Sequence, residues 1–235
     1  MNSAADHDRT LASPNDRFGE RFKASVSASS VQAQIIAAES RSLATTFSEL
    51  EHTGAAAKAA ALIVGARRKF IAGEGKSAVY AGLLNSDLSA TLSNVFLVDG
   101  RALSGVTILT DVRTTDVLVV FSMRRYRRES LRLGQLFKQA GGQLVVVTDS
   151  VDAPLASLAD ALITVHTGSA SYADSPTAVA AVCHLLSALT SSSAKGARRR
   201  LADRDDLARA LDLYDPTDPD DPTDPDNPPG ANEPA

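Results

Sequence analysis

The stretch FIAGEGKS, residues 70–77, joins an apolar run to a segment rich in Ala, Leu and Ser. An apolar run before a glycine turn is typical of a buried strand, and the segment after the turn has helical composition. A glycine loop between a strand and a helix N-terminus favours anions, because loop N–H groups and the helix dipole face the ligand. The stretch therefore predicts an anion-binding turn in an α/β fold.

The same succession of strand, turn and helix continues on both sides of this turn. It predicts strands over residues 69–72, 95–98, 116–121, 143–148 and 161–165, and helices over 31–50, 55–66, 77–92, 102–109, 128–140, 153–158, 176–190 and 198–213. Continuous apolar strands alternating with helices indicate a parallel sheet that is covered on both faces. We therefore expect a three-layer αβα sandwich with a five-stranded parallel sheet, whose ligand lies at the carboxyl ends of the strands.

Length and charge divide the chain into three parts. Its 235 residues, 44% hydrophobic and 22% charged, suffice for one good core. Residues 1–30 lack sustained periodicity and residues 215–235 repeat Asp and Pro, so we expect both segments to be disordered, with one domain over 31–214. The tail holds seven carboxylates and no Lys or Arg, so the net charge of −4 becomes +3 for the rest of the chain. A mildly basic body fits an anionic small ligand better than DNA.

Several classes of protein are excluded by what the sequence lacks. No apolar run approaches the roughly 20 residues that span a membrane, and no secretory signal is visible, so a cytoplasmic location is expected. The lone Cys183 rules out a disulfide framework and a cysteine-based zinc site, and its place in an apolar segment predicts a small buried side chain. We expect no metal and no cofactor.

The glycine turn has three other interpretations. A nucleotide triphosphate loop needs a glycine at position 70, where this chain has Phe70. A dinucleotide fingerprint, Gly73-x-Gly75-x-x-Ala78, lacks the expected spacing to the acidic residue, because Asp99 comes 26 residues after Gly73 rather than about 20. A tight turn without any ligand stays open.

The turn resembles a known family once three further stretches are added to it. These are VVFSMRRYRRES (119–130), GGQLVVVTDS (141–150) and PLASLAD (154–160). Together with Gly73-x-Gly75-x-Ser77 they resemble the sugar isomerase (SIS) domain, in the version found in the RpiR/MurR family of bacterial regulators. The resemblance covers about residues 31–190 and implies a domain that binds a sugar phosphate.

The resemblance and the loop positions together predict the ligand contacts. The residues expected to bind the ligand are Gly73, Gly75, Lys76, Ser77, Ser122, Arg124, Arg125, Arg127 and Thr148. The family's third-strand loop usually reads Ser-x-Ser-Gly-x-Thr, whereas only the first hydroxyl, Ser122, is kept here. The arginines that replace the others can grip phosphate or carboxylate with two N–H groups, so a sugar acid or a phosphorylated amino-sugar acid is a further possibility.

The sequence predicts one main function and leaves two alternatives open. We expect binding or sensing of a phosphorylated or anionic sugar derivative, and self-association as a homodimer or homotetramer. An aldose–ketose isomerase is the enzyme alternative, for which Glu74, Glu129 and His166 are the candidate bases. Glu129 also has a simpler explanation, since an acid in the first turn of a helix interacts with the dipole. The family's regulators carry a helix-turn-helix domain, and only about 30 unpatterned residues precede position 31, so direct nucleic-acid binding is not expected. A regulator is the third alternative, if such a domain lies upstream.

Overall fold

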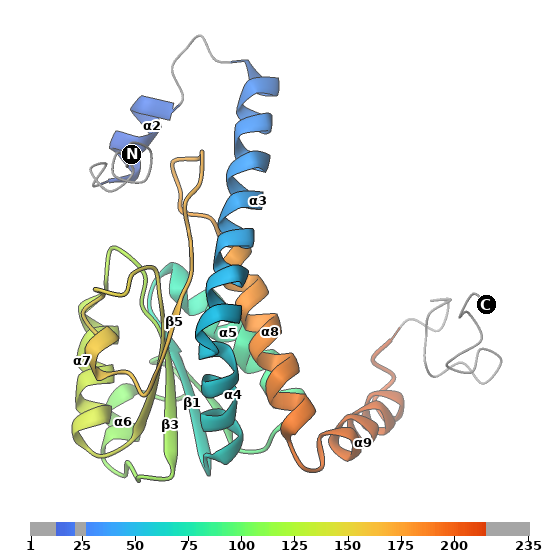
Figure 1. Cartoon of the computed structure of the whole chain (residues 1–235). Coiled ribbons are helices and arrows are strands. Elements are labelled where there is room, and N and C mark those ends of the chain that lie inside the picture. The colour runs from blue at the N-terminus through green and yellow to red at the C-terminus, as the bar shows by residue number, and fades with distance from the viewer. Residues whose placement is uncertain (1–12, 22–26, 215–235) are drawn as a thin grey trace, which may run out of the picture.

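The computed structural model describes residues 13–21 and 27–214 (Figure 1). Its helices are α2 (Pro14–Arg21), α3 (Ala28–Thr53), α4 (Ala55–Gly65), α5 (Lys76–Thr91), α6 (Gly105–Leu109), α7 (Arg128–Gln139), the 3-10 helix η1 (Ala156–Leu158), α8 (Thr177–Ser193) and α9 (Ala197–Ala210). Its strands are β1 (Arg68–Gly73), β2 (Val95–Val98), β3 (Asp116–Phe121), β4 (Gln143–Thr148) and β5 (Ala161–Thr164). The expected succession of elements is present.

The five strands form one parallel sheet in the order β2-β1-β3-β4-β5. β3 lies at the centre, and all six of its residues are buried. Strands that are covered on both faces are apolar along most of their length, which is why β3 and β4 each contain a continuous run of Val and Leu, at 117–120 and 144–147, rather than an alternating pattern. The predicted class, a three-layer α/β fold with a five-stranded parallel sheet, is confirmed.

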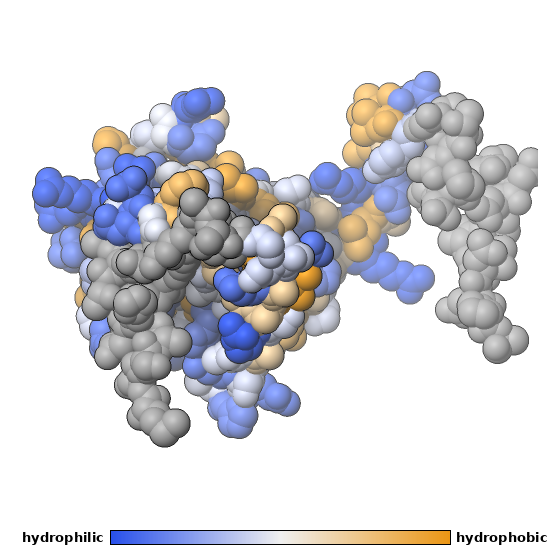
Figure 2. All heavy atoms as spheres, turned by 90° about the horizontal axis from the view of Figure 1, so that it is seen from above, coloured by the Kyte–Doolittle hydropathy of each residue, from blue (hydrophilic) through white to orange (hydrophobic). Residues whose placement is uncertain are grey.

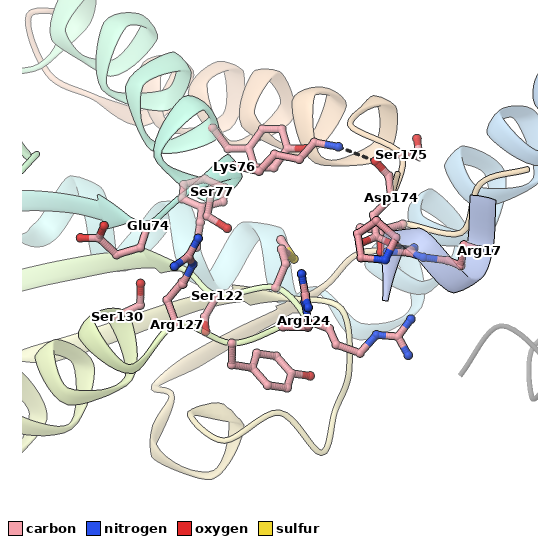
Figure 3. A pocket seen from close by; sticks show the side chains of 17 residues that line it. Arg17, Glu74, Lys76, Ser77, Ser122, Arg124, Arg127, Ser130, Asp174 and Ser175 are labelled. Carbon is pink, nitrogen blue, oxygen red and sulfur yellow. Dashed lines mark hydrogen bonds and ion pairs between the residues drawn. The ribbon is translucent and has the colours of Figure 1, made fainter. Parts of the chain in front are cut away.

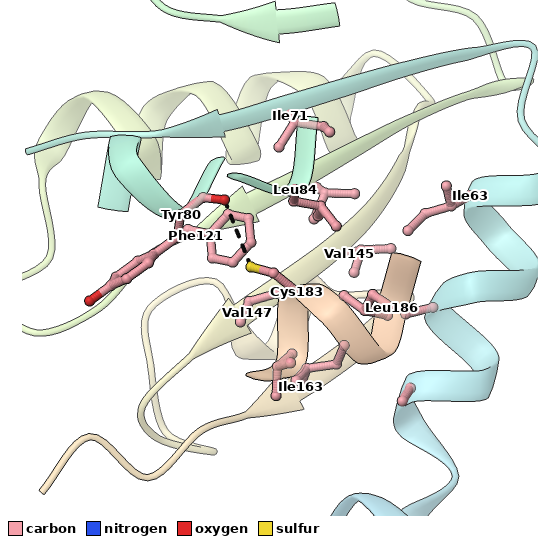
Figure 4. Packing of buried hydrophobic residues seen from close by; sticks show 14 of the residues in the cluster. Ile63, Ile71, Tyr80, Leu84, Phe121, Val145, Val147, Ile163, Cys183 and Leu186 are labelled. Carbon is pink, nitrogen blue, oxygen red and sulfur yellow. Dashed lines mark hydrogen bonds between the residues drawn. The ribbon is translucent and has the colours of Figure 1, made fainter. Parts of the chain in front are cut away.

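Alternate side chains of the strands enter two separate cores. On one face Ile71, Val119 and Val145 pack with α4, α5 and α8 (Figure 4). On the other face Phe70 and Val120 pack with side chains of α6 and α7. Figure 1 shows α4, α5 and α8 gathered on one side of the sheet and α6 and α7 on the other. The sequence thus needs two apolar faces per strand because each face has its own helical layer.

Cys183 of α8 belongs to the first core. Its side chain is fully buried, and its Sγ lies 3.8 Å from the carbonyl oxygen of Tyr80 (Figure 4). Burial raises the pKa of the thiol to about 12, so the sulfur stays protonated. The expectation of a small buried side chain is confirmed.

An ion pair stabilises the end of the sheet where the strands begin. Arg68 Nε donates to Asp116 Oδ1 at 3.0 Å, and the backbone N–H of Arg113 donates to Asp116 Oδ2 at 2.8 Å. Burial alone would raise the pKa of the Asp116 carboxyl, but these hydrogen bonds outweigh it and hold that pKa below its usual range. The charged form of Asp116 therefore stabilises the fold.

The amino-terminal part of the chain differs from expectation. Residues 1–30 were expected to be disordered, whereas Pro14–Arg21 form α2 and α3 already begins at Ala28. Ser13 and Asp16 explain the start of α2, because the Ser13 hydroxyl accepts the Asp16 N–H and the Asp16 carboxylate accepts the Ser13 N–H. The expectation for residues 215–235 lies outside the described residues.

Two short helices are shorter in the structure than the sequence pattern predicts. The predicted helix at 102–109 is reduced to α6, because Asp99 accepts hydrogen bonds from the N–H groups of residues 101–103 and so stabilises a turn. The predicted helix at 153–158 is reduced to η1. Within the part of the chain that the structure describes, no single helix has the length and apolarity to cross a membrane, and the one candidate pair, α8 with α9, is bent by 108°.

Candidate functional site

A pocket of about 560 Å³ opens at the carboxyl ends of β1 and β3 (Figure 3). These two strands are neighbours, but the chain leaves them in opposite directions across the sheet, which is where ligands bind in open α/β folds. The lining residues are Pro14, Arg17, Glu74, Lys76, Ser77, Tyr80, Phe121, Ser122, Met123, Arg124, Arg125, Tyr126, Arg127, Ser130, Thr167, Asp174 and Ser175. Figure 2 looks down on this end, where hydrophilic and apolar residues are mixed.

The glycine turn brings the start of α5 to the pocket. A Cβ atom at Gly73 would lie 2.5 Å from the carbonyl oxygen of Ser77, so only glycine allows this close approach. Gly75 has φ +62°, and the guanidinium of Arg127 packs over it. The N–H groups of Ser77 and Ala78 are used within the turn, by the carbonyls of Glu74 and Gly75. The helix dipole and the Ser77 side chain, more than those two N–H groups, are what the turn offers an anion.

Two serine hydroxyls in this pocket are buried without a partner. Ser122 follows β3 and is 4% exposed, and Ser130 in the first turn of α7 is 2% exposed. Within the described residues neither Oγ atom has a hydrogen-bond partner. The Ser122 backbone, in contrast, is fixed on both sides, since its N–H donates to Val147 and its carbonyl accepts the Thr148 hydroxyl at 2.7 Å. Buried hydroxyls without partners are uncommon, and both of these residues line the pocket.

The charges of the lining residues are mostly positive. Five lining side chains are cationic and two are carboxylates. Lys76 Nζ donates to the main-chain carbonyl of Asp174, and Arg17 Nη1 forms an ion pair with the Asp174 carboxylate. Figure 3 shows Lys76 and Arg17 reaching Asp174 from two sides. The arginine loop, residues 124–128, supplies the other cations.

Two tyrosines complete the wall of the pocket. Burial and the nearby Asp174 raise the pKa of Tyr80 to about 12. Burial and the carboxylate of Asp149 raise the pKa of Tyr126 to about 12, and the Tyr126 hydroxyl donates to Asp149 Oδ1 at 3.0 Å. Both phenols therefore stay protonated at neutral pH, and Tyr126 ties the arginine loop to the end of β4.

The loop after β5 forms the far rim of the pocket, and α3 holds it. The Ser42 hydroxyl donates to the Gly168 carbonyl at 2.8 Å, and the Ser175 hydroxyl donates to the carboxylate of Glu39. Figure 1 shows this loop rising beside α3, above the sheet. The middle of α3 thus positions Thr167, Asp174 and Ser175 at the pocket.

The structure brings most of the predicted ligand residues together. Lys76, Ser77, Ser122, Arg124, Arg125 and Arg127 all line the pocket, and Gly73 and Gly75 shape the turn behind it. The candidate base Glu74 lines the pocket as well. Thr148 does not line it, because its hydroxyl is spent on the Ser122 carbonyl. That these six predicted side chains bind a ligand stays a prediction.

Two of the candidate bases lie elsewhere. Glu129 is exposed and does not line the pocket. His166 Nε2 lies 2.9 Å from Glu49 Oε1, and the backbone N–H of His166 donates to the Thr46 hydroxyl at 2.9 Å. This histidine therefore connects the end of β5 to α3. Among the described residues, no group of three or more His, Cys, Asp or Glu side chains is arranged to hold a metal ion.

Sequence reasoning did not predict Arg17, Tyr80, Tyr126, Ser130 and Asp174 as site residues. Ser130 had a signal, because it opens the helix after the arginine loop as Lys76 and Ser77 open α5. Asp174 lies in a segment with no periodic pattern, and Arg17 precedes every strand by more than 45 residues, so neither carried a local signal.

Comparisons with known proteins agree with this geometry. The sequence model of the SIS domain matches residues 62–191. The sugar isomerase domain of the RpiR transcription factor from Sphaerobacter thermophilus has a TM-score of 0.68 at 22% identity, over 78% of this chain and 99% of that one. The Vibrio vulnificus NanR protein complexed with ManNAc-6P has a TM-score of 0.61 at 14% identity, over 74% of this chain and 68% of that one.

A third solved structure, that of E. coli CFT073 c3406 in complex with A5P, has a TM-score of 0.55 at 16% identity, over 76% of this chain and 99% of that one. No curated protein matches the chain in sequence. Structures at such low identity show the fold alone, whereas the domain match covers more than half of the chain. The glycine turn, the 2-1-3-4-5 sheet and this match together show that the chain belongs to the SIS domain family.

Proposed function

We propose that the pocket binds a phosphorylated or otherwise anionic sugar derivative, and that the chain acts as a binding or sensing module for it. The observation that carries this proposal is the pair of buried, unpartnered hydroxyls of Ser122 and Ser130, beside Ser77 at the start of α5. Leaving a hydroxyl buried without a partner destabilises a protein by about 1–3 kcal/mol. A phosphate has enough acceptor oxygens to satisfy several hydroxyls at once.

The size and charge of the pocket support the same class of ligand. A volume of about 560 Å³ falls within the roughly 300–1,000 Å³ of small-molecule sites. The excess of cationic over acidic lining side chains favours an anion. Two proteins of the same fold were solved with sugar phosphates, ManNAc-6P in NanR and A5P in c3406, which supports the class of ligand and leaves the compound open.

Isomerisation of a sugar phosphate is the second candidate, and Glu74 keeps it open. Proton transfer between neighbouring carbons needs a base within hydrogen-bond reach of the substrate. Glu74 lines the pocket, whereas the other lining carboxylate, Asp174, is already paired with Arg17. One available carboxylate supports binding more directly than catalysis, so we place binding first.

A ligand screen with a turnover assay tests both candidates. Glucose 6-phosphate, arabinose 5-phosphate and N-acetylmannosamine 6-phosphate are compared with the same sugars lacking phosphate, by thermal shift and calorimetry. We expect at least one phosphate ester to bind and its parent sugar to bind at least about tenfold more weakly, since a charge-assisted hydrogen bond contributes about 1.5–3 kcal/mol.

Variants connect any binding to the pocket. Ser122→Ala should abolish most of the thermal shift, and Ser48→Ala, at an exposed serine in the penultimate turn of α3, should not. Conversion of the bound aldose to a ketose that Glu74→Gln removes would favour the isomerase. Failure of every phosphate ester to bind would contradict the proposal.

A further inference from the structure

Helix α2 contributes Arg17 to the pocket, although it lies well before the matched SIS region at 62–191. The arginine is only 6% exposed, and its Nη1 pairs with the carboxylate of Asp174 in the loop after β5. Figure 3 shows the Arg17 side chain entering from the side of the pocket opposite Glu74. The contact joins two segments that are 157 residues apart in the sequence.

The hydrogen-bonding capacity of Arg17 is only partly used. A guanidinium has five N–H donors in a planar fork, and it binds carboxylate or phosphate best through two of them at once. Here Nε is buried and has no partner among the described residues, while a single nitrogen makes the ion pair with Asp174. Asp174 therefore gives Arg17 a one-point contact where the guanidinium can make a two-point one.

Asp174 also contacts Lys76. Its main-chain carbonyl accepts the Lys76 ammonium, so Asp174 engages cations from two different elements. Its side chain is 29% exposed, so water can solvate the carboxylate when an anion replaces it on Arg17. An anion that replaces it on Arg17 gains the unused Nε–H without burying Asp174.

We propose that the ligand carries a second anionic group, and that this group replaces the Asp174 carboxylate on Arg17. The inference rests on the proposed function, which places the first anion at the hydroxyls of Ser77, Ser122 and Ser130. Asp174 then stands in for the second anion in the free protein. The ligand class narrows to sugars with two anionic groups, namely a sugar bisphosphate or a phosphorylated sugar acid.

Calorimetry on the full chain with three probes tests this inference. Glucose 6-phosphate has one phosphate, glucose 1,6-bisphosphate adds a second phosphate, and 6-phosphogluconate adds a carboxylate. We expect at least one of the two-anion probes to bind about tenfold tighter than glucose 6-phosphate, as expected for one extra charge-assisted contact. Which of the two does so identifies the second group.

Three variants locate the effect. Arg17→Gln should reduce the preference for the second anion to within about twofold. It should weaken glucose 6-phosphate binding by no more than about threefold, the smaller loss expected when the pocket loses one positive charge without losing a direct contact. Asp174→Asn should tighten the two-anion probe several-fold, because it weakens the internal competitor. Arg199→Gln, at an 86% exposed arginine of α9, is the charge-matched control and should change neither affinity. Arg17→Lys keeps the charge without the fork and should recover only part of the preference.

The results that overturn the inference differ from those that overturn the proposed function. If glucose 6-phosphate binds but Arg17→Gln weakens all probes by one common factor, Arg17 adds only general positive potential and the inference is wrong. Weaker binding of the two-anion probe to Asp174→Asn would likewise show that Asp174 contacts the ligand instead of competing with it. If neither glucose 6-phosphate nor the other probes bind the unaltered chain, the proposed function fails and the inference falls with it. Melting curves that match the Arg199→Gln control confirm that each variant is folded.

Discussion

Replacing Ser130 by alanine should make the protein more stable and its ligand binding weaker. Ser130 is 2% exposed and its hydroxyl has no partner among the described residues, so the free protein keeps a desolvated polar group that does nothing for the fold. The same hydroxyl faces a pocket in which an anion can accept it. The two effects have opposite signs because they act on different states of the protein.

The magnitudes follow from the position of the residue. Removing a buried, unsatisfied hydroxyl should raise the free energy of unfolding by about 1 kcal/mol, and alanine adds up to about 0.5 kcal/mol through its higher helix propensity. For a domain of this size each kcal/mol shifts the melting temperature by about 2–4 °C, so we expect a rise of about 2–6 °C. A lost hydrogen bond to a charged ligand should weaken binding at least about tenfold.

Two assays on the same preparation decide this prediction. Melting without ligand measures stability, and titration with the best sugar phosphate of the screen measures affinity. Ser48→Ala, at an exposed serine in the penultimate turn of α3, controls for helix propensity and should show only the smaller stability gain. A lower melting temperature for Ser130→Ala would refute the claim that the hydroxyl is unsatisfied, and unchanged affinity would refute its role in binding.

Four further expectations concern the turn, the sheet and the surface. Ser77→Ala should weaken phosphate binding roughly tenfold with an unchanged circular dichroism spectrum, and equal affinity would contradict its placement at the anion. Gly73→Ala should lower the free energy of unfolding by about 2 kcal/mol or more in a denaturant titration, because the alanine Cβ would lie 2.5 Å from the Ser77 carbonyl oxygen. Asp116→Asn should be less stable than the unaltered chain at pH 7. The gap should shrink as the pH falls below about 4, since a depressed pKa gives stability that acid removes, and a constant gap would argue against the ion pair. The apolar groove lined by Phe47 and Leu189 should be covered by a second copy, so light scattering at micromolar concentration should give a dimer or tetramer and not a monomer.

The strands of the sheet could be predicted because each one is marked by a pattern of neighbouring residues. The boundaries of β2, β3 and β4 agree with the sequence pattern to the residue, since each is a continuous apolar run between polar ends. The glycine turn could be predicted for a related reason, because Gly73 is required by a backbone approach only four residues away. Parallel sheets also place the carboxyl ends of their strands together, which assembles Ser77 and Ser122 at one site.

The remaining site residues depend on contacts that no local pattern encodes. The Arg17–Asp174 pair joins a short helix near the N-terminus to an irregular loop 157 residues away, and no local pattern in either segment indicates the other. Thr148 shows the opposite error, because its position at a strand end predicted a ligand contact, whereas its hydroxyl bonds the neighbouring strand. Its side chain is aimed by the register between β3 and β4, which composition does not specify.

A crystal structure of the chain with the best-binding sugar phosphate tests the central claim most directly. The account predicts that the phosphate lies between the hydroxyls of Ser77, Ser122 and Ser130, within about 3 Å of the latter two Oγ atoms, so that both buried hydroxyls gain an acceptor. A phosphate bound elsewhere on the molecule, with the Ser122 and Ser130 hydroxyls still unpartnered, would contradict it.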